Sequence, residues 1–425
     1  MDFRYEMIFS IRNFWAKAAK PPPQHGNAPT ATENLEEAIV TITRRQYLKG
    51  SAGVAAAGLL GQPLAALAQT NLANLPTTMI WSTYDVGSTG YVEASAIADA
   101  FGKRYGTRVR LQPSGSAIGR VKPLTDGRAT HAWLANELYF AVEGIYEYCA
   151  PDWGPQDLRT LLGRQNAFSV VATKVSGITQ PKDLKGKRFA IARANSSVNI
   201  KVEPILAFAG LTWNDLELVE FPSYGATLKG LVEGKADCAG VAPAAATLRE
   251  LEASPHGIGW VALDPGNKEG WARAQKAVPF VEPFEESIGA GLSAEKPVWM
   301  MGYRYPMITV GAAASADEVY AMTKAVAESF EDYKAANPIM PRWEAAKAGT
   351  PPMDAAFHDG AIRYLKEAGI WKPEHQSWQD AALKRHAALQ AAWKSMMATE
   401  AAKAAELPAL QALWDGQRAE ALKSL

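Results

Sequence analysis

The sequence predicts an α/β protein built from two lobes. In the first repeat of a strand, loop and helix, a β-rich run at Thr78–Tyr84 is followed by turn residues at Asp85–Gly90 and by helical spacing of apolar residues at Tyr91–Phe101. A second series of such repeats begins at Phe189–Ala192. With 425 residues, of which 48% are hydrophobic and 21% charged, the chain is long enough to bury two cores.

The first lobe continues with two further strands. Arg108–Gln112 reads as a strand, a glycine-serine loop follows at Pro113–Ala117, and Ile118–Thr125 reads as a helix. His131–Ala135 is a third short strand, closed by Asn136 and Glu137. Parallel strands end at one edge of their sheet, and ligands of such sheets bind at that edge.

Phe168–Thr173, at the end of the first part of lobe 1, is strongly strand-like. The second lobe has the same pattern as the first. Its strand at Phe189–Ala192 is followed by a polar loop at Arg193–Ser197 and a helix at Val198–Ala209. Strands at Leu216–Phe221 and Cys238–Val241 flank a helix at Ala226–Glu233.

The remaining chain returns to the first lobe and ends in helices. Strands are expected at Ile258–Leu263 and Tyr305–Ala313, and helices at Ala316–Ala335, Ala361–Glu367 and Ser377–Leu425. The last helices either brace the lobes or face a partner. The expected divisions are a leader with signal peptide at 1–68, the first part of lobe 1 at 69–173, lobe 2 at 174–260, the return to lobe 1 at 261–370 and a helical extension at 371–425.

The N-terminal part has the pattern of a twin-arginine (Tat) signal peptide. Thr43–Lys49 contains the arginine pair, Gly50–Leu60 is a short apolar run, and Ala66-Leu67-Ala68 is a small-residue cleavage site. A chance arginine pair before a core helix is the alternative. The signal predicts export to the periplasm with a mature chain that begins at Gln69.

Composition and motifs argue against several other classes. The formal net charge is zero, and no basic tract points to nucleic acid. The six histidines and two cysteines show no metal-ligand spacing, so neither a metal nor a cofactor is expected. Cys149 and Cys238 are either core residues or a disulfide. Ser293–Lys296 matches Ser-x-x-Lys without its companion motifs, so no enzyme is expected.

Several patches in register resemble the TAXI solute-binding proteins of TRAP (tripartite ATP-independent periplasmic) transporters. They are Gly87–Tyr91, Ser114-Gly115-Ser116, Gly177-Ile178 with Asp183–Arg188, Leu231–Asp237 and, most specifically, His358–Gly369. The resemblance implies a two-lobed, periplasmic binding protein-like (type II) fold with additional C-terminal helices. It also implies a receptor, expected to be a monomer, that captures a small carboxylate-like solute for a TRAP-type membrane permease. An ABC-type periplasmic receptor and a Tat-exported, cofactor-binding oxidoreductase are the alternatives.

Two arginines are the leading candidates for holding an anionic solute. Arg193 stands where the family usually has a glycine, and Arg120 adds a guanidinium after the second glycine loop. A guanidinium binds a carboxylate through two parallel hydrogen bonds, although either arginine is equally compatible with a structural ion pair. The other predicted ligand-binding residues lie in loops or at strand ends, where helix caps and core aromatics are the alternative roles: Tyr84, Gly87, Ser88, Thr89, Tyr91, Ser114, Gly115, Ser116, Asn136, Glu137, Asn195, Ser196, Ser197, Ala242, Pro243 and Tyr303.

Overall fold

The computed structural model describes residues 75–278, 281–423 and 425. The predicted leader, twin-arginine motif and cleavage site lie outside these residues. Within the described part of the chain, no helix is both long enough and apolar enough to cross a membrane.

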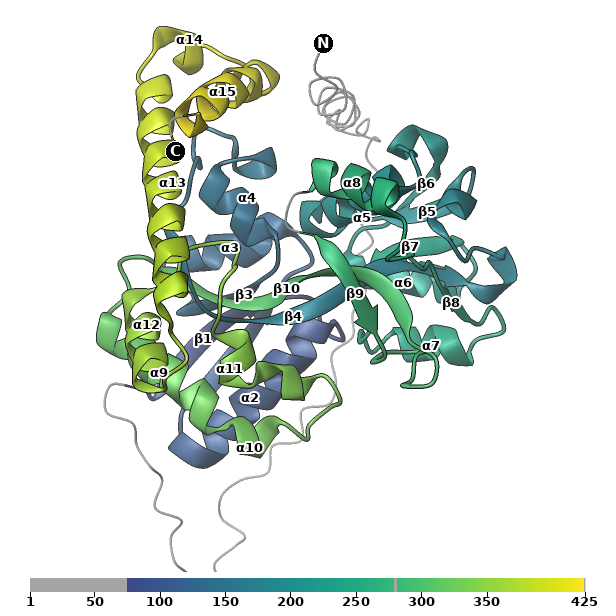
Figure 1. The fold of residues 1–425 in the computed structure, drawn as a ribbon, viewed down its shortest axis with the longest axis horizontal. Coiled ribbons are helices and arrows are strands. Elements are labelled where there is room, and N and C mark those ends of the chain that lie inside the picture. The colour runs from purple at the N-terminus through teal and green to yellow at the C-terminus, as the bar shows by residue number, and fades with distance from the viewer. Residues whose placement is uncertain (1–74, 279–280, 424) are drawn as a thin grey trace, which may run out of the picture. The chain divides into compact units, whose positions relative to one another are not determined.

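Ten strands form one continuous sheet through both lobes (Figure 1). Its order is β2-β1-β3-β10-β4-β7-β5-β6, with β8 paired to β4 and β9 paired to β10. The strands are β1 (Thr78–Thr83), β2 (Arg108–Pro113), β3 (His131–Leu134), β4 (Leu158–Thr173), β5 (Arg188–Ile191), β6 (Glu217–Glu220), β7 (Cys238–Val241), β8 (Ile258–Trp260), β9 (Glu282–Glu286) and β10 (Val298–Gly311).

Two long antiparallel strands join the lobes. Residues 158–168 of β4 pair with β10, whereas Ser169–Ala172 pair with β7 in the second lobe. The C-terminal part of β10 also pairs with β3 in lobe 1, through Met307–Thr309. The polypeptide therefore passes between the lobes within two strands that are hydrogen-bonded to each other.

The sequence pattern predicted only part of each joining strand. The expected strand at Phe168–Thr173 is the second-lobe end of β4, and the expected strand at Tyr305–Ala313 is the first-lobe end of β10. Both predictions were too short, and in β4 the reason is that polar residues interrupt the apolar run. Arg164 and Asn166 are nevertheless buried in β4, and Arg164 is paired there with a carboxylate.

Helices follow the strands as the repeats predicted, and this confirms the two-lobed, periplasmic binding protein-like α/β fold with additional C-terminal helices. Ser88, Ser116 and Asn195 cap α2, α3 and α5 with their side-chain oxygens. The helices are α2 (Thr89–Tyr105), α3 (Ala117–Thr125), α4 (Glu137–Glu143), α5 (Ser196–Phe208), α6 (Tyr224–Val232), α7 (Leu248–Ala253), α8 (Lys268–Ala277), α9 (Ala316–Glu328), α10 (Phe330–Tyr333), α11 (Ala345–Ala348), α12 (Asp359–Glu367), α13 (Pro373–Met397), α14 (Glu400–Lys403) and α15 (Leu407–Leu422).

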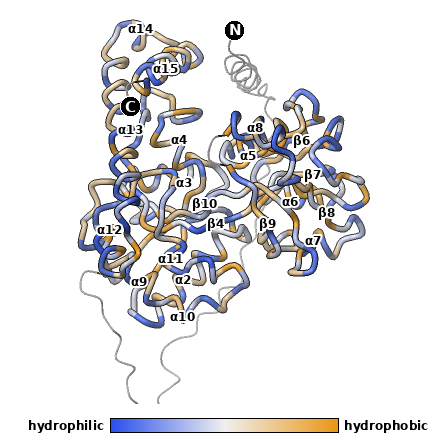
Figure 2. The backbone as a smooth tube through the Cα atoms, viewed as in Figure 1, coloured by the Kyte–Doolittle hydropathy of each residue, from blue (hydrophilic) through white to orange (hydrophobic). Residues whose placement is uncertain are grey.

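The C-terminal helices pack against lobe 1 through α4. Hydrophilic and hydrophobic residues alternate along α13 (Figure 2), as expected for a helix with one packed face. The Glu143 carboxylate at the end of α4 accepts hydrogen bonds from Arg385 on α13 and Arg418 on α15. Trp414 of α15 also donates its indole N–H to the Glu143 carbonyl oxygen at 3.2 Å. The C-terminal helices therefore brace lobe 1.

The core of lobe 1 contains a fully buried ion pair. Glu93 on α2 accepts a hydrogen bond from Arg164 Nε at 2.6 Å and another from Trp343 Nε1 at 2.5 Å. All three side chains are inaccessible to solvent. Water cannot stabilise either charge there, so each charge depends on its partner.

Substituting Glu93→Gln should lower the free energy of unfolding by about 3–5 kcal/mol, because it leaves the Arg164 charge buried and uncompensated. Glu331→Gln is the matched control, since Glu331 pairs with Lys334 on the exposed surface. Urea unfolding followed by circular dichroism measures both. Equal effects of the two substitutions would contradict this account of the core.

Candidate functional site

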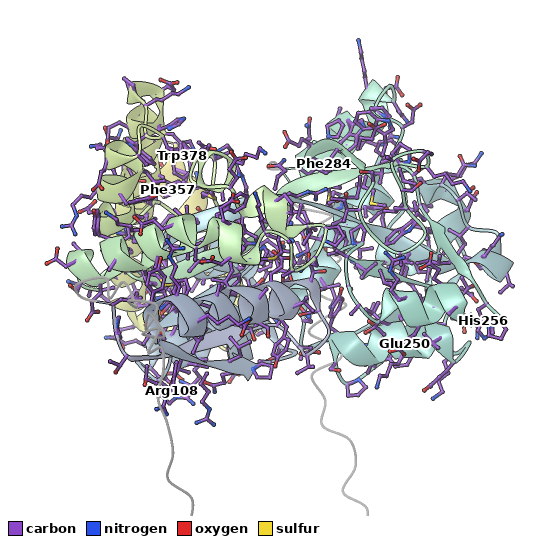
Figure 3. All side chains as sticks on the ribbon, turned by 90° about the horizontal axis from the view of Figure 1, so that it is seen from below. Arg108, Glu250, His256, Phe284, Phe357 and Trp378 are labelled. Atoms are coloured by element: carbon purple, nitrogen blue, oxygen red, sulfur yellow. The ribbon has the colours of Figure 1, made fainter. Side chains whose placement is uncertain are left out.

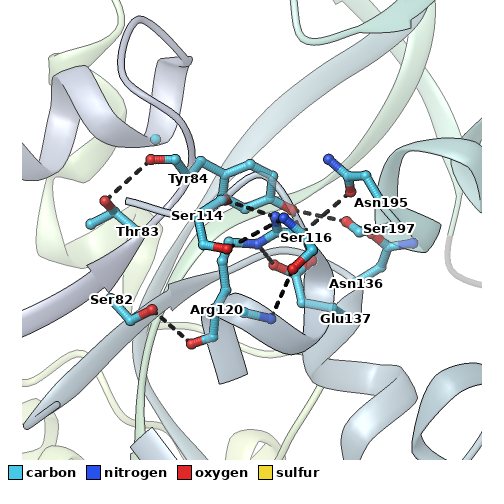
Figure 4. A network of polar contacts seen from close by, with 12 residues as sticks. Ser82, Thr83, Tyr84, Ser114, Ser116, Arg120, Asn136, Glu137, Asn195 and Ser197 are labelled. Carbon is cyan, nitrogen blue, oxygen red and sulfur yellow. Dashed lines mark hydrogen bonds and ion pairs between the residues drawn. The ribbon is translucent and has the colours of Figure 1, made fainter. Parts of the chain in front are cut away.

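Polar side chains from both lobes meet where β1, β3 and β5 end and where α3, α4 and α5 begin. We name this group the cleft cluster; Figure 4 shows most of it. Its members are Tyr84, Arg120, Asn136 and Glu137 from lobe 1 and Asn195, Ser197 and Lys201 from lobe 2.

Arg120 is the centre of the lobe 1 side. Its Nε donates to Glu137 Oε1 at 2.8 Å, its second nitrogen donates to the Ser114 carbonyl at 3.2 Å, and the third donates to Asn195 Oδ1 at 3.4 Å. The guanidinium carbon lies 3.7 Å from the centre of the Tyr84 ring. Both Arg120 and Glu137 have no solvent exposure. This fully satisfied pair fixes the two side chains in one geometry.

Hydrogen bonds between side chains then cross from lobe 1 to lobe 2. The Tyr84 hydroxyl lies 2.8 Å from Glu137 Oε2 and 2.9 Å from Ser197 Oγ. Ser197 donates to Asn136 Oδ1 at 2.7 Å, and Lys201 donates to the same oxygen at 2.9 Å. The start of α5 is therefore held directly against the start of α4.

Backbone groups also join the lobes. Ala117 N–H donates to the Ala194 carbonyl at 3.2 Å, and Ala246 N–H donates to the Gly87 carbonyl at 3.0 Å. Asp85 accepts from the Gly225 N–H at 3.2 Å. With contacts at three places along the cleft, the structure is a closed arrangement of the lobes.

Two buried amide groups in the cluster keep unused donors. Asn136 and Asn195 both use their side-chain oxygens as acceptors, which fixes the orientation of each amide. Their Nδ2 atoms are buried and have no partner among the described residues. Buried donors without partners are costly, so these two atoms mark a place where an acceptor group is needed.

Lys201 is the second buried cation of the cluster. Its Nζ lies 4.7 Å from the centre of the Tyr303 ring and 5.8 Å from that of Tyr305. Burial lowers the pKa of Lys201 to about 7, although Glu137 acts in the opposite direction. Near neutral pH this amine therefore exchanges its proton readily.

Two carboxyl groups, Glu137 in the cleft cluster and Glu147 beside it, differ in charge. Burial opposes ionisation of Glu137, but Arg120 and Lys201 outweigh it, so the pKa of Glu137 lies below its usual value. Burial raises the pKa of Glu147 to about 7, even though Ser196 donates a hydrogen bond to it. Glu137 is therefore the permanent anion of the site.

The structure brings together many of the predicted site residues. Tyr84, Arg120, Asn136, Glu137, Asn195 and Ser197 belong to the cleft cluster, and Ser114 contributes its carbonyl oxygen. Ser88 and Ser116 serve as helix caps, the alternative role, while Ser196 contacts Glu147. Tyr303 lies against Lys201, and its hydroxyl accepts from Asn166 at 3.2 Å.

Other predicted residues lie elsewhere along the interface of the lobes. Thr89 and Pro243 line a cavity of about 210 Å³ between α2 and the loop after β7. Gly87 has the positive φ of 84° that favours glycine, and Gly115 lies so near Asp85 that a Cβ atom would come within 2.9 Å of its carboxylate. The Ala242 carbonyl accepts from the Ala245 N–H, and Tyr91 is half-buried on α2.

Arg193, one of the two arginine candidates, is directed to a different partner. Its guanidinium forms an ion pair with Glu220 at the end of β6, the strand next to β5. The side chain is 31% exposed, whereas that of Arg120 is fully buried. Of the two predicted arginines, only Arg120 thus belongs to the cleft cluster.

Sequence reasoning missed Lys201, Glu147 and Tyr305. Lys201 carries a detectable signal, because it is the one basic residue of helix α5 and lies four positions after Ser197, on the same face. Cys149 and Cys238 are both buried and are not joined by a disulfide, so the core alternative is confirmed and the disulfide alternative is wrong. Among the described residues, no group of three His, Cys, Asp or Glu is placed to bind a metal.

Comparisons with known proteins give the family. The sequence profile of the NMT1-like family matches residues 82–369, and the chain belongs to this family. A search of curated proteins returned no match.

Solved structures show more distant similarities. The alkanesulfonate-binding protein SsuA from Xanthomonas axonopodis pv. citri bound to MOPS is 14% identical, with a TM-score of 0.38 over 69% of this chain and 85% of that chain. SsuA from Escherichia coli is 14% identical, with a TM-score of 0.39 over 70% and 84%. A phosphonate ABC transporter binding protein from Pseudomonas aeruginosa is 11% identical, with a TM-score of 0.41 over 82% and 97%.

Lys201 should make stability depend on pH above neutrality. Folded Lys201 loses its proton near pH 7, whereas the unfolded side chain keeps it up to its ordinary value of 10.5. Between these values the unfolded state binds more protons, so the free energy of unfolding rises with pH, by at most about 1.4 kcal/mol per pH unit. Lys201→Met should remove this rise. Urea titrations of both proteins at pH 7, 8 and 9 measure it, and parallel pH curves would refute the burial effect.

Proposed function

We propose that this protein is a periplasmic solute receptor that closes its two lobes around a small, anionic organic solute and then delivers it to a membrane permease. The observation that carries the proposal is the cleft cluster. Buried side chains from both lobes meet there directly, and two amide donors in it are unused. The site has the groups for recognition and for closure, and the proposal assigns it no chemical step.

Charge supports an anionic solute. The charges of Arg120 and Glu137 cancel, and protonated Lys201 then leaves the cluster with one positive charge in excess. A carboxylate-like group beside Lys201 would balance that charge and accept from the amides of Asn136 and Asn195. The parallel rings of Tyr303 and Tyr305, with centres 5.9 Å apart, offer an apolar surface to the rest of the solute.

Closure by bending of two strands fits the architecture. Among the strands of the described residues, only β4 and β10 run through both lobes, whereas the other contacts at the cleft are hydrogen bonds between separate elements. A small change in the twist of β4 and β10 therefore separates α5 from α4 without breaking either core. Hinge closure around a ligand is a common mode of capture by two-lobed proteins.

Delivery to a TRAP-type permease rests on the sequence resemblance. In the most specific of its motifs, His358 caps α12 by accepting from the Gly360 N–H at 3.1 Å, so this histidine has a structural role. An ABC-type transporter is the alternative partner. A gene for a TRAP permease adjacent to the gene of this protein favours the former, and a gene for an ATP-hydrolysing subunit favours the latter. Export by the twin-arginine route belongs to the same proposal.

Affinity for the solute should fall as pH rises through 7. Lys201 loses its positive charge in that range, while Glu147 gains a negative charge, and both changes oppose an anion. Lys201→Met should weaken binding at pH 6.5 at least about tenfold and flatten the pH dependence. Arg193→Ala is the control, with affinity within about threefold of the parent because this arginine is paired with Glu220. Isothermal titration calorimetry at several pH values measures both variants, and the reverse ranking would move the site to Arg193.

Mass spectrometry of the small molecules released from the purified protein tests the function itself. We expect one anionic organic compound in about a 1:1 ratio to protein, and its calorimetric titration into solute-free protein should reproduce that ratio. The proposal fails if no anionic compound is released and none of a panel of carboxylates and sulfonates binds.

A further inference from the structure

A second cavity, of about 290 Å³, lies between lobe 1 and the C-terminal helices. One wall comes from α4 and the start of β4, and another from residues 353–356. The third wall is α13, which lies outside the residues matched by the NMT1-like family. The cavity is therefore a feature of this chain's C-terminal extension rather than of the cleft between the lobes.

One face of α13 is shaped to leave this space. Trp378, Ala381, Ala382 and Arg385 follow the helical spacing of three and four residues, and all of them line the cavity. The two alanines are short, so the space in front of them stays open. Trp378 closes one end and packs against Phe357, with ring centres 6.1 Å apart (Figure 3).

The basic groups of the cavity already have carboxylate partners. Arg385 is paired with Glu143, and Arg159 is paired with Asp157 at 2.6 Å. His386 Nε2 lies 3.3 Å from the same Asp157 without a hydrogen bond to it, and burial lowers the pKa of His386, so this ring is not a standing cation. These groups therefore do not call for an anion.

Asp354 is an acidic residue of the cavity that, unlike Glu143 and Asp157, has no basic partner in the described part of the chain. Asp354 lines the cavity, and its carboxyl group forms no hydrogen bond or ion pair with any described residue. The charges that act on it come from Lys201, Glu137 and Arg304, none of which is in direct contact with it. A partly buried carboxylate without a direct partner is stabilised by any cation that reaches it.

We propose that this cavity binds a small aliphatic amine, with the ammonium group at Asp354 and the apolar part against Trp378 and Ala382. The Trp378 ring adds a face to which an ammonium ion is attracted. Burial raises the pKa of Asp354 to about 7, so the carboxylate is available to the amine above neutral pH. The cavity is lined by other residues than the cleft cluster, and the charges of Lys201 and Glu137 act on Asp354 from a distance.

Three probes of similar length test it: n-butylammonium, n-butanol and n-butyrate, whose polar ends are cationic, neutral and anionic. We expect calorimetry and ligand-observed NMR at pH 8 to show saturable binding of butylammonium and none of butyrate, with butanol at least about tenfold weaker. Asp354→Asn should weaken butylammonium binding at least about tenfold, because the amide keeps the size and loses the charge.

Ala382→Leu fills the cavity and should abolish amine binding while leaving binding of the cleft solute unchanged. Ala387→Leu, on the exposed face of the same helix, is the matched control and should keep amine binding. The proposal is overturned if butanol binds as well as butylammonium, if either Asp354→Asn or Ala382→Leu leaves amine binding intact, or if butylammonium fails to bind up to about 10 mM.

Discussion

The ion pair between Arg120 and Glu137 is the constraint on which the cleft depends. Neither side chain has any exposure to solvent, so each charge persists only because the other is 2.8 Å away. Such a pair contributes little net stability once its desolvation is counted, but removing one partner is severely destabilising. The ion pair matters because it fixes the positions of its two side chains. Arg120 and Glu137 hold the edge of lobe 1 in one geometry, against which Tyr84, Asn195 and Ser197 align.

The short helix α4 connects this edge to the rest of the molecule. It begins at Glu137, which binds Arg120 in the cleft, and it ends at Glu143, which binds Arg385 and Arg418 of the C-terminal helices. This helix of seven residues is thus held by an ion pair at each end. The C-terminal extension supports the wall of the cleft through α4 and, at the same time, builds a separate cavity against it.

The repeats of strand, loop and helix were sufficient to predict the two-lobed fold and much of the cluster. Asn136, Glu137, Asn195 and Ser197 follow strand ends, where parallel topology gathers side chains, so their position in sequence indicated their position in space. Lys201 lies in the second turn of α5, where only its place four residues after Ser197, as the one basic side chain of the helix, marked it. Arg193 was predicted at the site but pairs with Glu220 on the next strand, because a loop position at the cleft does not reveal that partner.

The lengths of β4 and β10 could not be obtained from local pattern for a similar reason. Arg164 looks like a surface residue in sequence, yet Glu93, 71 positions earlier, makes its burial possible. Buried polar pairs of this kind are decided by tertiary contacts, which the pattern of a single segment does not contain. The full length of the strands that join the lobes is therefore seen only when the chain is folded.

A crystal structure of the protein with its released solute tests the central claim most directly. The account places an acidic group of the solute within hydrogen-bond distance of Asn136 Nδ2, Asn195 Nδ2 and Lys201 Nζ, with Arg120 still bound to Glu137. A solute bound outside the cleft between the lobes, with the amide donors of Asn136 and Asn195 unchanged, would contradict it.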